Sequence, residues 1–90
     1  MTQSQTNRTP AEVGRIGREI YQRDIRPKVE AENVGRFIAI DIRNGAYEID
    51  DDDMKVVEHY LAREPNGELL VLRIGYNAAH ALGGRLRKVV

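Results

Sequence analysis

Apolar and polar residues alternate on both sides of Asn44-Gly45 within the stretch Gly35–Asp50, GRFIAIDIRNGAYEID. Such alternation is typical of β-strands, because successive side chains point to opposite faces of a sheet. Asn-Gly between two strands favours a two-residue turn with positive φ at both positions. The stretch therefore predicts a β-hairpin in which Ile40 pairs with Ile49.

The predicted pairing gives the hairpin two different faces. The apolar face consists of Ile38, Ile40, Ile42, Tyr47 and Ile49. The other face carries Phe37, Ala39, Asp41 and Glu48. Asp41 would lie opposite Glu48, and carboxylates paired across two strands repel each other unless a cation is near. We interpret these two as solvated carboxylates near a turn; the alternative is a site for a cation or an arginine.

Helical patterns flank the hairpin. Thr9-Pro10-Ala11-Glu12 combines a capping box with proline at the first helical position, so we expect a helix from Pro10 to about Asp24. Pro27 predicts that this helix stops and that Lys28–Val34 is a loop. One stripe of the helix, mostly apolar, consists of Val13, Ile16, Gly17, Ile20, Tyr21 and Asp24. Glycine within such a stripe predicts a close approach to another backbone.

An acidic run, Asp50–Asp53, precedes a second helical pattern that ends near Arg63. We expect Asp50 to cap this helix and the other three acids to lie at the positive end of its dipole. Calcium binding is the alternative, but the run lacks the glycine and glutamate positions of an EF-hand. The residues expected to face inward are Met54, Val57, Tyr60 and Leu61.

Glu68–Ile74, ELLVLRI, predicts a third strand that is apolar on both faces apart from Arg73, and such a strand needs cover on both sides. We expect the first strand in the middle of the sheet, with Phe37 and Ala39 in a second, smaller core. Tyr76–Leu82 predicts a short helix. The fold class is therefore α+β: an N-terminal helix, a three-stranded mostly antiparallel sheet (a hairpin plus a crossover helix) and a short C-terminal helix. One domain would span residues 10–84, between a disordered tail (1–9) and a basic tail (85–90).

Composition limits the class of protein. The 90 residues include no cysteine, which excludes disulfides and thiolate metal sites. The chain has no signal-peptide pattern and no apolar run near the ~20 residues of a membrane span, so we expect a cytoplasmic protein without membrane association. The formal net charge is zero but divides into +3, −6 and +3 over residues 1–29, 30–64 and 65–90. These segments neutralise one another within the fold, or they leave a basic patch for an anionic partner.

The sequence offers little catalytic chemistry. Ser4 is the one serine, and the two histidines, His59 and His80, have no second histidine at ligand spacing. No P-loop, dinucleotide fingerprint or metalloprotease motif is present. We therefore expect no enzymatic activity, no cofactor and no metal.

Two resemblances bear on function. Val13–Ile20, VGRIGREI, resembles the GxxG loop of KH domains, which bind nucleic acid, but the capping box places both glycines inside one helix. The stretches GREIYQRDIRPKVE (17–30), GRFIAIDIRNGAYEID (35–50) and LVLRIGYNAAHALGGR (70–85) together resemble a family of short, functionally uncharacterised bacterial proteins. This second resemblance implies an antitoxin-like component of a bacterial two-gene system and carries no catalytic residue.

The leading hypothesis is a small non-enzymatic module that binds a protein partner. The alternative is a nucleic-acid-binding protein that uses basic residues of the first helix and the C-terminal tail, namely Arg15, Arg18, Arg23, Arg26, Arg85, Arg87 and Lys88. The apolar third strand and two open sheet edges also predict a homodimer. Its expected contacts are Ile16, Ile20, Tyr21, Phe37 and one alternate set from the third strand.

Overall fold

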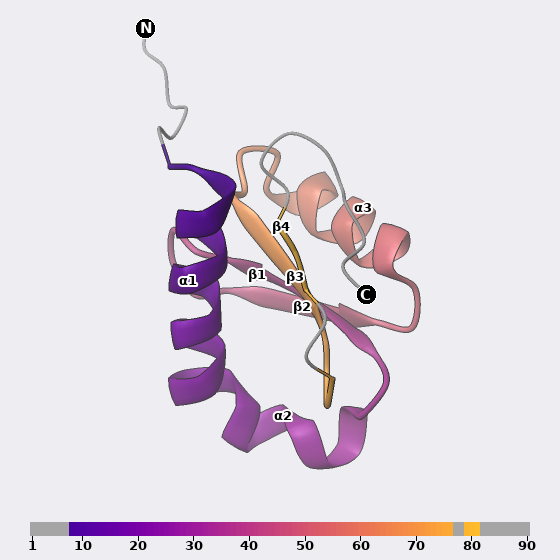
Figure 1. The fold of residues 1–90 in the computed structure, drawn as a ribbon. Coiled ribbons are helices and arrows are strands. Elements are labelled where there is room, and N and C mark those ends of the chain that lie inside the picture. The colour runs from indigo at the N-terminus through magenta and orange to yellow at the C-terminus, as the bar shows by residue number, and fades with distance from the viewer. Residues whose placement is uncertain (1–7, 77–78, 82–90) are drawn as a thin grey trace, which may run out of the picture.

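The computed structural model describes residues 8–76 and 79–81. Its elements, in chain order, are α1 (Pro10–Ile20), the π-helix η1 (Tyr21–Ile25), α2 (Arg26–Asn33), β1 (Phe37–Asp41), β2 (Tyr47–Asp50), α3 (Asp53–Arg63), β3 (Leu69–Arg73) and β4 (Ala79–Ala81). The strands form one antiparallel sheet in the order β2-β1-β3-β4 (Figure 1). The predicted α+β class, with the first strand between the second and the third, is confirmed. No helix in the described ranges is long and apolar enough to cross a membrane.

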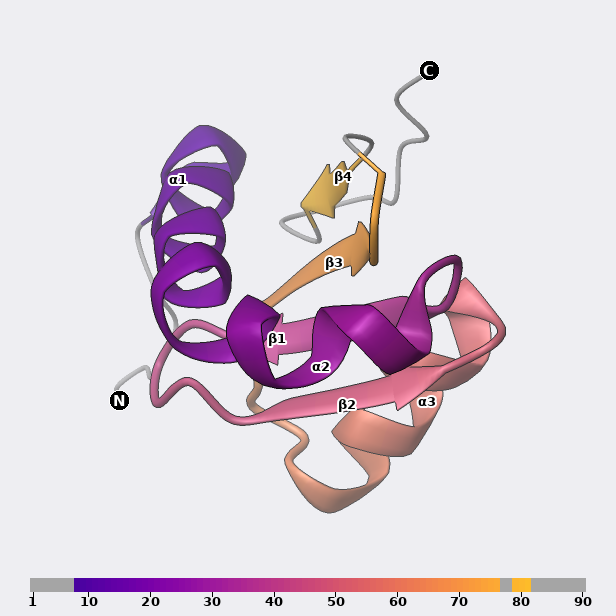
Figure 2. The same cartoon turned by 90° about the horizontal axis from the view of Figure 1, so that it is seen from below.

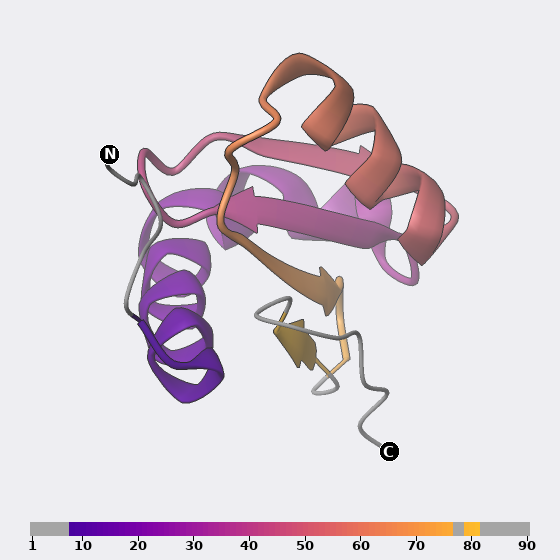
Figure 3. The same ribbon diagram turned by 90° about the horizontal axis from the view of Figure 1, so that it is seen from above.

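Helices cover both faces of the sheet, and each face forms its own core. Figure 2 shows β2 between α2 and α3, while α1 lies beside β3 and β4. The larger core joins α1, η1 and α2 to one sheet face through Val13, Tyr21, Ile25, Val29, Ile38, Ile40, Ile42, Leu70, Leu72 and Ile74. The smaller core joins α3 to the other face through Ala39, Val56, Tyr60, Leu69 and Val71, with Phe37 packed against it. The predicted second core is therefore present, and Figure 3 shows α3 on its outer side.

The N-terminal helix is longer than predicted, because Pro27 does not end it. The capping box is confirmed: Thr9 Oγ1 accepts from the Glu12 amide at 3.1 Å, and the Glu12 carboxylate accepts from the Thr9 amide at 2.9 Å. After α1 the chain continues as the π-helix η1, in which the Arg26 amide donates to the carbonyl of Tyr21, five residues earlier. This wider turn places Pro27 in the first turn of α2, where a missing N–H needs no acceptor. The predicted loop is therefore wrong; most of it is α2, which lies at a sharp angle to α1 (Figure 1).

Gly17 brings α1 close to the sheet, as the sequence predicts. A Cβ atom at Gly17 would lie 2.6 Å from Cδ2 of Leu70 and 2.9 Å from its Cβ. Both Gly14 and Gly17 lie inside α1. The arrangement therefore differs from a GxxG loop between two helices.

The hairpin forms, but its register differs from the prediction by two residues. Ile40 pairs with Tyr47 rather than with Ile49. The loop has four residues, Ile42–Gly45, and is closed by the Asp41 amide, which donates to the Ala46 carbonyl at 2.8 Å. Of the described residues with positive φ all are glycines, so Gly45 (φ 80°) has this conformation and Asn44 does not. A shift of two residues leaves every side chain on its predicted face, because the period of a strand is two.

Helix α3 begins later than predicted. Asp50 belongs to β2, and the cap is Asp52, whose carboxylate accepts from the amides of Met54 (2.8 Å) and Lys55 (3.0 Å). Of the residues predicted to face inward, Tyr60 is buried, and Val57 and Leu61 pack against the smaller core. Met54 is the exception at 51% exposure, and Val56 is buried instead. Within the acidic run, Asp52 and Asp53 lie at the start of the helix, as expected.

The chain after β3 corrects two further predictions. Ala79–Ala81, placed by the sequence in a short helix, forms the strand β4, in which His80 pairs with Val71. Strand β3 is therefore not an edge of the sheet. Residues 77–78 and 82–90, and with them the predicted basic tail, lie outside the described residues, as do residues 1–7 of the predicted N-terminal tail.

The first helix closes the larger core within one chain. Ile16 and Ile20 pack against this core, and Tyr21 is 6% exposed. These side chains were expected at a homodimer interface, together with Phe37, which packs against the smaller core. These side chains therefore cover the two cores within one chain, and the homodimer, with its expected contacts, stays a prediction.

Candidate functional site

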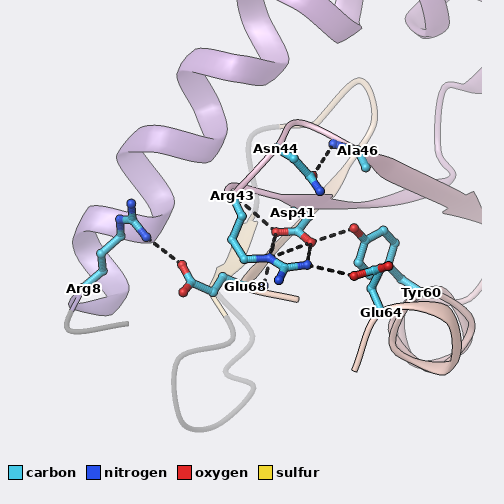
Figure 4. A network of polar contacts seen from close by, with 8 residues as sticks. All are labelled: Arg8, Asp41, Arg43, Asn44, Ala46, Tyr60, Glu64 and Glu68. Atoms are coloured by element: carbon cyan, nitrogen blue, oxygen red, sulfur yellow. Dashed lines mark hydrogen bonds and ion pairs between the residues drawn. The ribbon is translucent and has the colours of Figure 1, made fainter. Parts of the chain in front are cut away.

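Two of the buried side chains among the described residues differ in how fully their polar atoms are hydrogen-bonded. The first is Asp41, which is 0% exposed at the end of β1. Its Oδ2 accepts from Arg43 Nη2 at 2.7 Å and from the Tyr60 hydroxyl at 2.6 Å (Figure 4). Its Oδ1 accepts from the Arg43 amide at 3.0 Å and from the Glu68 amide at 3.4 Å. The interpretation of Asp41 as a solvated carboxylate is wrong, and the alternative of an arginine site is the arrangement found.

These contacts keep Asp41 ionised. Burial raises the pKa of its carboxyl, but the hydrogen bonds from Arg43 and Tyr60 and from two backbone amides outweigh burial and lower the pKa to about 2. Burial, followed by the neighbouring Asp41 carboxylate, raises the pKa of Tyr60. The tyrosine therefore stays protonated and donates its hydrogen to the carboxylate.

The Asp41 network is a structural clamp. It joins the hairpin loop, α3 and the chain before β3, and Arg43 also reaches Glu64 at 3.2 Å. Gly67 makes room for it, since a Cβ atom there would lie 2.9 Å from the Tyr60 ring. Both oxygens of Asp41 are occupied by donors of the chain itself. The carboxylate therefore has little remaining capacity for a ligand.

The acidic run contributes local contacts rather than a cation site. Asp51 pairs with Arg36 at 2.7 Å, and Asp50 lies 3.4 Å from Nδ1 of His59. Asp52 is the cap of α3. Within residues 8–76 and 79–81, no group of three or more acidic or histidine side chains is arranged to hold a metal ion.

The second buried polar group is the hydroxyl of Tyr21, and it has no hydrogen-bond partner among the described residues. Tyr21 is the first residue of η1, and single π-helical turns occur frequently at functional sites. Burial raises the pKa of Tyr21, and the nearby Glu30 carboxylate adds to this rise. A protonated hydroxyl buried without a partner costs ~1–3 kcal/mol, so this group marks a place where a ligand can restore a lost interaction.

Two small hollows meet at Tyr21. One, of about 110 Å³, is lined by Tyr21, Gln22, Arg26, Glu30, Gly75 and Tyr76. The other, of about 100 Å³, is lined by Arg18, Tyr21, Gln22, Leu72, Arg73 and Tyr76. Because Tyr21, Gln22 and Tyr76 line both, we treat them as one feature and call it the Tyr21 groove. It lies between the π-helix and the end of β3.

Tyr76, which lines both hollows of the Tyr21 groove, is 54% exposed. Gly75 (φ 86°) lies close to Val34, which is 61% exposed, since a Cβ atom there would be 2.9 Å from Cγ1 of Val34. The guanidinium carbon of Arg73 lies 4.3 Å from the centre of the Tyr76 ring and 5.5 Å from that of Phe37. The Arg73 guanidinium therefore lies near both the Tyr76 ring, which lines the groove, and the Phe37 ring, which packs against the smaller core.

Comparisons with protein-family models, with curated proteins and with solved structures found no match for this chain.

Three of the predicted basic residues form ion pairs with carboxylates close to them in the chain. Arg15 pairs with Glu19 at 4.0 Å, Arg23 with Asp24 at 3.1 Å and Arg26 with Glu30 at 2.8 Å. Arg18 has no ion-pair partner in the described part of the chain, and it lines the Tyr21 groove together with Arg26. Arg85, Arg87 and Lys88 lie outside the described residues.

Sequence reasoning assigned no binding role to Arg73, Tyr76 and Gln22 and expected Tyr21 at a dimer interface. One signal for Tyr21 was available, because a tyrosine on an apolar helical stripe needs a partner for its hydroxyl when it is buried. No comparable signal identified Tyr76. Tyr76 lines the groove because β3 lies beside α1 in the fold. This contact between distant parts of the chain cannot be read from the sequence pattern.

Proposed function

We propose that this chain is a small non-enzymatic interaction module that binds a segment of a protein partner in the Tyr21 groove. The observation that carries this proposal is the buried, unpartnered hydroxyl of Tyr21 in a groove that the exposed aromatic ring of Tyr76 also lines. Tyrosine and arginine are enriched among the residues that contribute most to binding at protein interfaces. Tyr76, with the Arg73 guanidinium stacked on its ring, has this character.

An enzymatic role has less support. Asp41 and Tyr60 are buried and bonded to each other, so neither reaches the surface without local unfolding. The raised pKa of Tyr21 keeps its hydroxyl protonated at neutral pH, which suits a hydrogen-bond donor rather than a general base. These groups serve stability or binding better than proton transfer.

Nucleic-acid binding is the second candidate, and the ion pairs along the N-terminal helix weaken it. Three of its four arginines, Arg15, Arg23 and Arg26, are paired with carboxylates of neighbouring residues. A phosphate backbone would have to compete with those carboxylates, which lowers the potential available to it. A protein partner that contacts only Arg18 and Arg73, which have no ion-pair partner among the described residues, is more compatible with the groove than a phosphate backbone.

The family resemblance suggests where to look for the partner. An antitoxin-like component of a bacterial two-gene system would bind the product of an adjacent gene, so that product is the first candidate. The proposal of a groove-binding module does not depend on this detail. A partner encoded elsewhere would be equally compatible with the groove.

Site-specific photo-crosslinking in cells tests the proposed function. A benzophenone amino acid is placed at position 76, and a matched control carries it at position 54, because Met54 is exposed to a similar extent but lies on α3. We expect a defined protein adduct from position 76 and none from position 54. The purified partner should then bind at least about tenfold more weakly to Tyr76→Ala than to Met54→Ala. Equal adducts at both positions, or equal affinities, would contradict a site in the groove, and binding to oligonucleotides that falls steeply with salt would favour the second candidate.

A further inference from the structure

Several hydrogen-bond donors in the walls of the smaller hollow of the Tyr21 groove have no acceptor among the described residues. Gln22 uses its carbonyl oxygen to accept from Arg26 Nη1 at 2.8 Å, which leaves its amide N–H₂ group to donate. Arg73 uses Nε to donate to the Gly35 carbonyl at 3.2 Å, which leaves its terminal nitrogens. Arg18 has no ion-pair partner, and the Tyr21 hydroxyl has no hydrogen-bond partner, among the described residues.

The side-chain groups of this hollow that remain available for hydrogen bonding are therefore almost all donors. Arginine has donors and no acceptor, and the free half of the Gln22 side chain also donates. The described residues that line this hollow include no carboxylate. The neighbouring hollow differs, because its lining includes both Arg26 and the Glu30 carboxylate, which form an ion pair at 2.8 Å. The walls of the smaller hollow thus match a group that only accepts hydrogen bonds and carries negative charge.

We propose that this hollow is an anion subsite that takes the carboxylate of an aspartate or glutamate side chain in an acidic segment of the partner. The assignment of this carboxylate to a protein partner rests on the proposed function. The existence of an anion subsite does not rest on it. An ionised carboxylate is acceptor-only and forms charge-assisted bonds with arginine. In the bound state, Arg18 and Arg73 supply the positive charge, while Tyr21 and Gln22 donate neutral hydrogen bonds.

The size of the hollow admits a carboxylate. A water molecule occupies roughly 30 Å³ in the liquid, so a hollow of about 100 Å³ has room for a group the size of a few waters. A carboxylate with its methylene group fits in such a space. The aromatic ring of Tyr76 and the side chain of Leu72 provide apolar contact for the methylene stem.

The subsite is tested on the whole chain by NMR titration with sodium acetate, its neutral isostere acetamide, and sodium phosphate. We expect acetate to shift the side-chain Nε–H signals of Arg18 and Arg73 saturably, and acetamide to leave them unchanged. Arg18→Gln should weaken acetate binding about tenfold, as expected for the loss of a hydrogen bond to a charged group. Arg15→Gln is the matched control, since Arg15 lies on the same helix but does not line the hollow.

A second variant separates binding from folding. Tyr21→Phe removes only the unpartnered hydroxyl, so it should weaken acetate binding while the melting temperature stays the same or rises. Acetate binding that is absent, or that is equal in the wild-type protein, Arg18→Gln and Tyr21→Phe, would overturn the subsite. Tighter binding of phosphate than of acetate would overturn the choice of a carboxylate.

The two proposals can fail separately. If acetate binds as expected but crosslinking at position 76 yields no partner, the proposed function fails and the subsite stands. If a purified partner binds the groove and its affinity is the same for Arg18→Gln and the wild-type protein, the assignment of a partner carboxylate to the subsite fails and the proposed function stands.

Discussion

The hydroxyl of Tyr60 donates a 2.6 Å hydrogen bond to the carboxylate of Asp41, and this contact joins α3 to the central strand β1. The two residues lie 19 positions apart in the chain. Both are almost completely buried, Asp41 at 0% and Tyr60 at 1% exposure. A buried charged group is tolerated only because its hydrogen-bonding capacity is filled. Removal of any one donor should therefore lower the stability of the smaller core.

The first prediction concerns loss of the carboxylate. Asp41→Ala removes the acceptor of Arg43, Tyr60 and the Glu68 amide, and should lower the free energy of unfolding by ~2–4 kcal/mol. This range is slightly below that of fully buried pairs, because the side chain of Arg43 is 32% exposed. Urea unfolding followed by circular dichroism measures it. Glu48→Ala is the control, since its carboxylate contacts only the exposed Arg63 side chain among the described polar groups, and its cost should stay below ~1 kcal/mol.

Acid should act on the same group. The pKa of Asp41 is about 2 in the folded chain, below its value near 3.8 in the unfolded chain. Its stabilising contribution is therefore fully present above pH ~4 and is lost as the pH falls from about 4 towards 2. The free energy of unfolding of the wild-type protein should decrease across this window, and Asp41→Asn should show a smaller decrease. Parallel pH profiles for the two proteins would contradict the role of this carboxylate.

Two tyrosine-to-phenylalanine variants should have opposite effects. Tyr60→Phe leaves the buried Asp41 carboxylate short of a donor and should cost ~1–3 kcal/mol. Tyr21→Phe removes a hydroxyl that has no partner among the described residues, so it should be neutral or stabilising. Thermal melts of both variants test the contrast between a hydroxyl with a hydrogen-bond partner and a buried hydroxyl without one among the described residues. Equal destabilisation would show that the Tyr21 hydroxyl already has a partner in solution.

The glycines of α1 allow a matched comparison. Gly17→Ala should destabilise the fold, by ~1–3 kcal/mol for an overpacked core, because the added Cβ would lie 2.6 Å from Cδ2 of Leu70. Gly14→Ala places a methyl group 3.5 Å from the flexible end of Arg18 and should stabilise the helix by ~0.5–1 kcal/mol. The midpoints of chemical denaturation of the two variants should therefore shift in opposite directions from that of the wild-type protein. A stabilising Gly17→Ala would mean that α1 does not approach β3 this closely.

The hairpin loop gives the last prediction. Gly45 has φ 80°, so Gly45→Ala should cost ~1–2 kcal/mol through backbone strain. Asn44 has no positive φ, and its side chain accepts one hydrogen bond, from the Ala46 amide at 2.9 Å. Asn44→Ala should therefore cost less, ~0.5–1.5 kcal/mol. The order of the two melting temperatures distinguishes the observed four-residue loop from the two-residue turn that the sequence predicts, in which both residues would be strained.

The sequence by itself determined the features that depend on near neighbours in the chain. The capping box needs only Thr9 and Glu12, three residues apart, and it forms as predicted. The faces of β1 follow from the period of two, so Ile38 and Ala39 enter different cores even though the hairpin register differs from the prediction. Gly17 was assigned a close approach because no other residue type on the stripe lacks a Cβ atom, and Leu70 fills that space.

Only the tertiary structure decided the features that depend on which surfaces meet. Pro27 continues the helix because η1 widens the preceding turn and Val29 gains burial in the larger core, which outweighs the local preference for a stop. Asp41 is a saturated clamp because α3 brings Tyr60 to it, although a carboxylate beside a turn is more often solvated. The Tyr21 groove exists because α1 lies beside β3, which places Tyr21 next to Tyr76. Such contacts join residues far apart in the chain, and their energies depend on burial, which no local pattern of residues specifies.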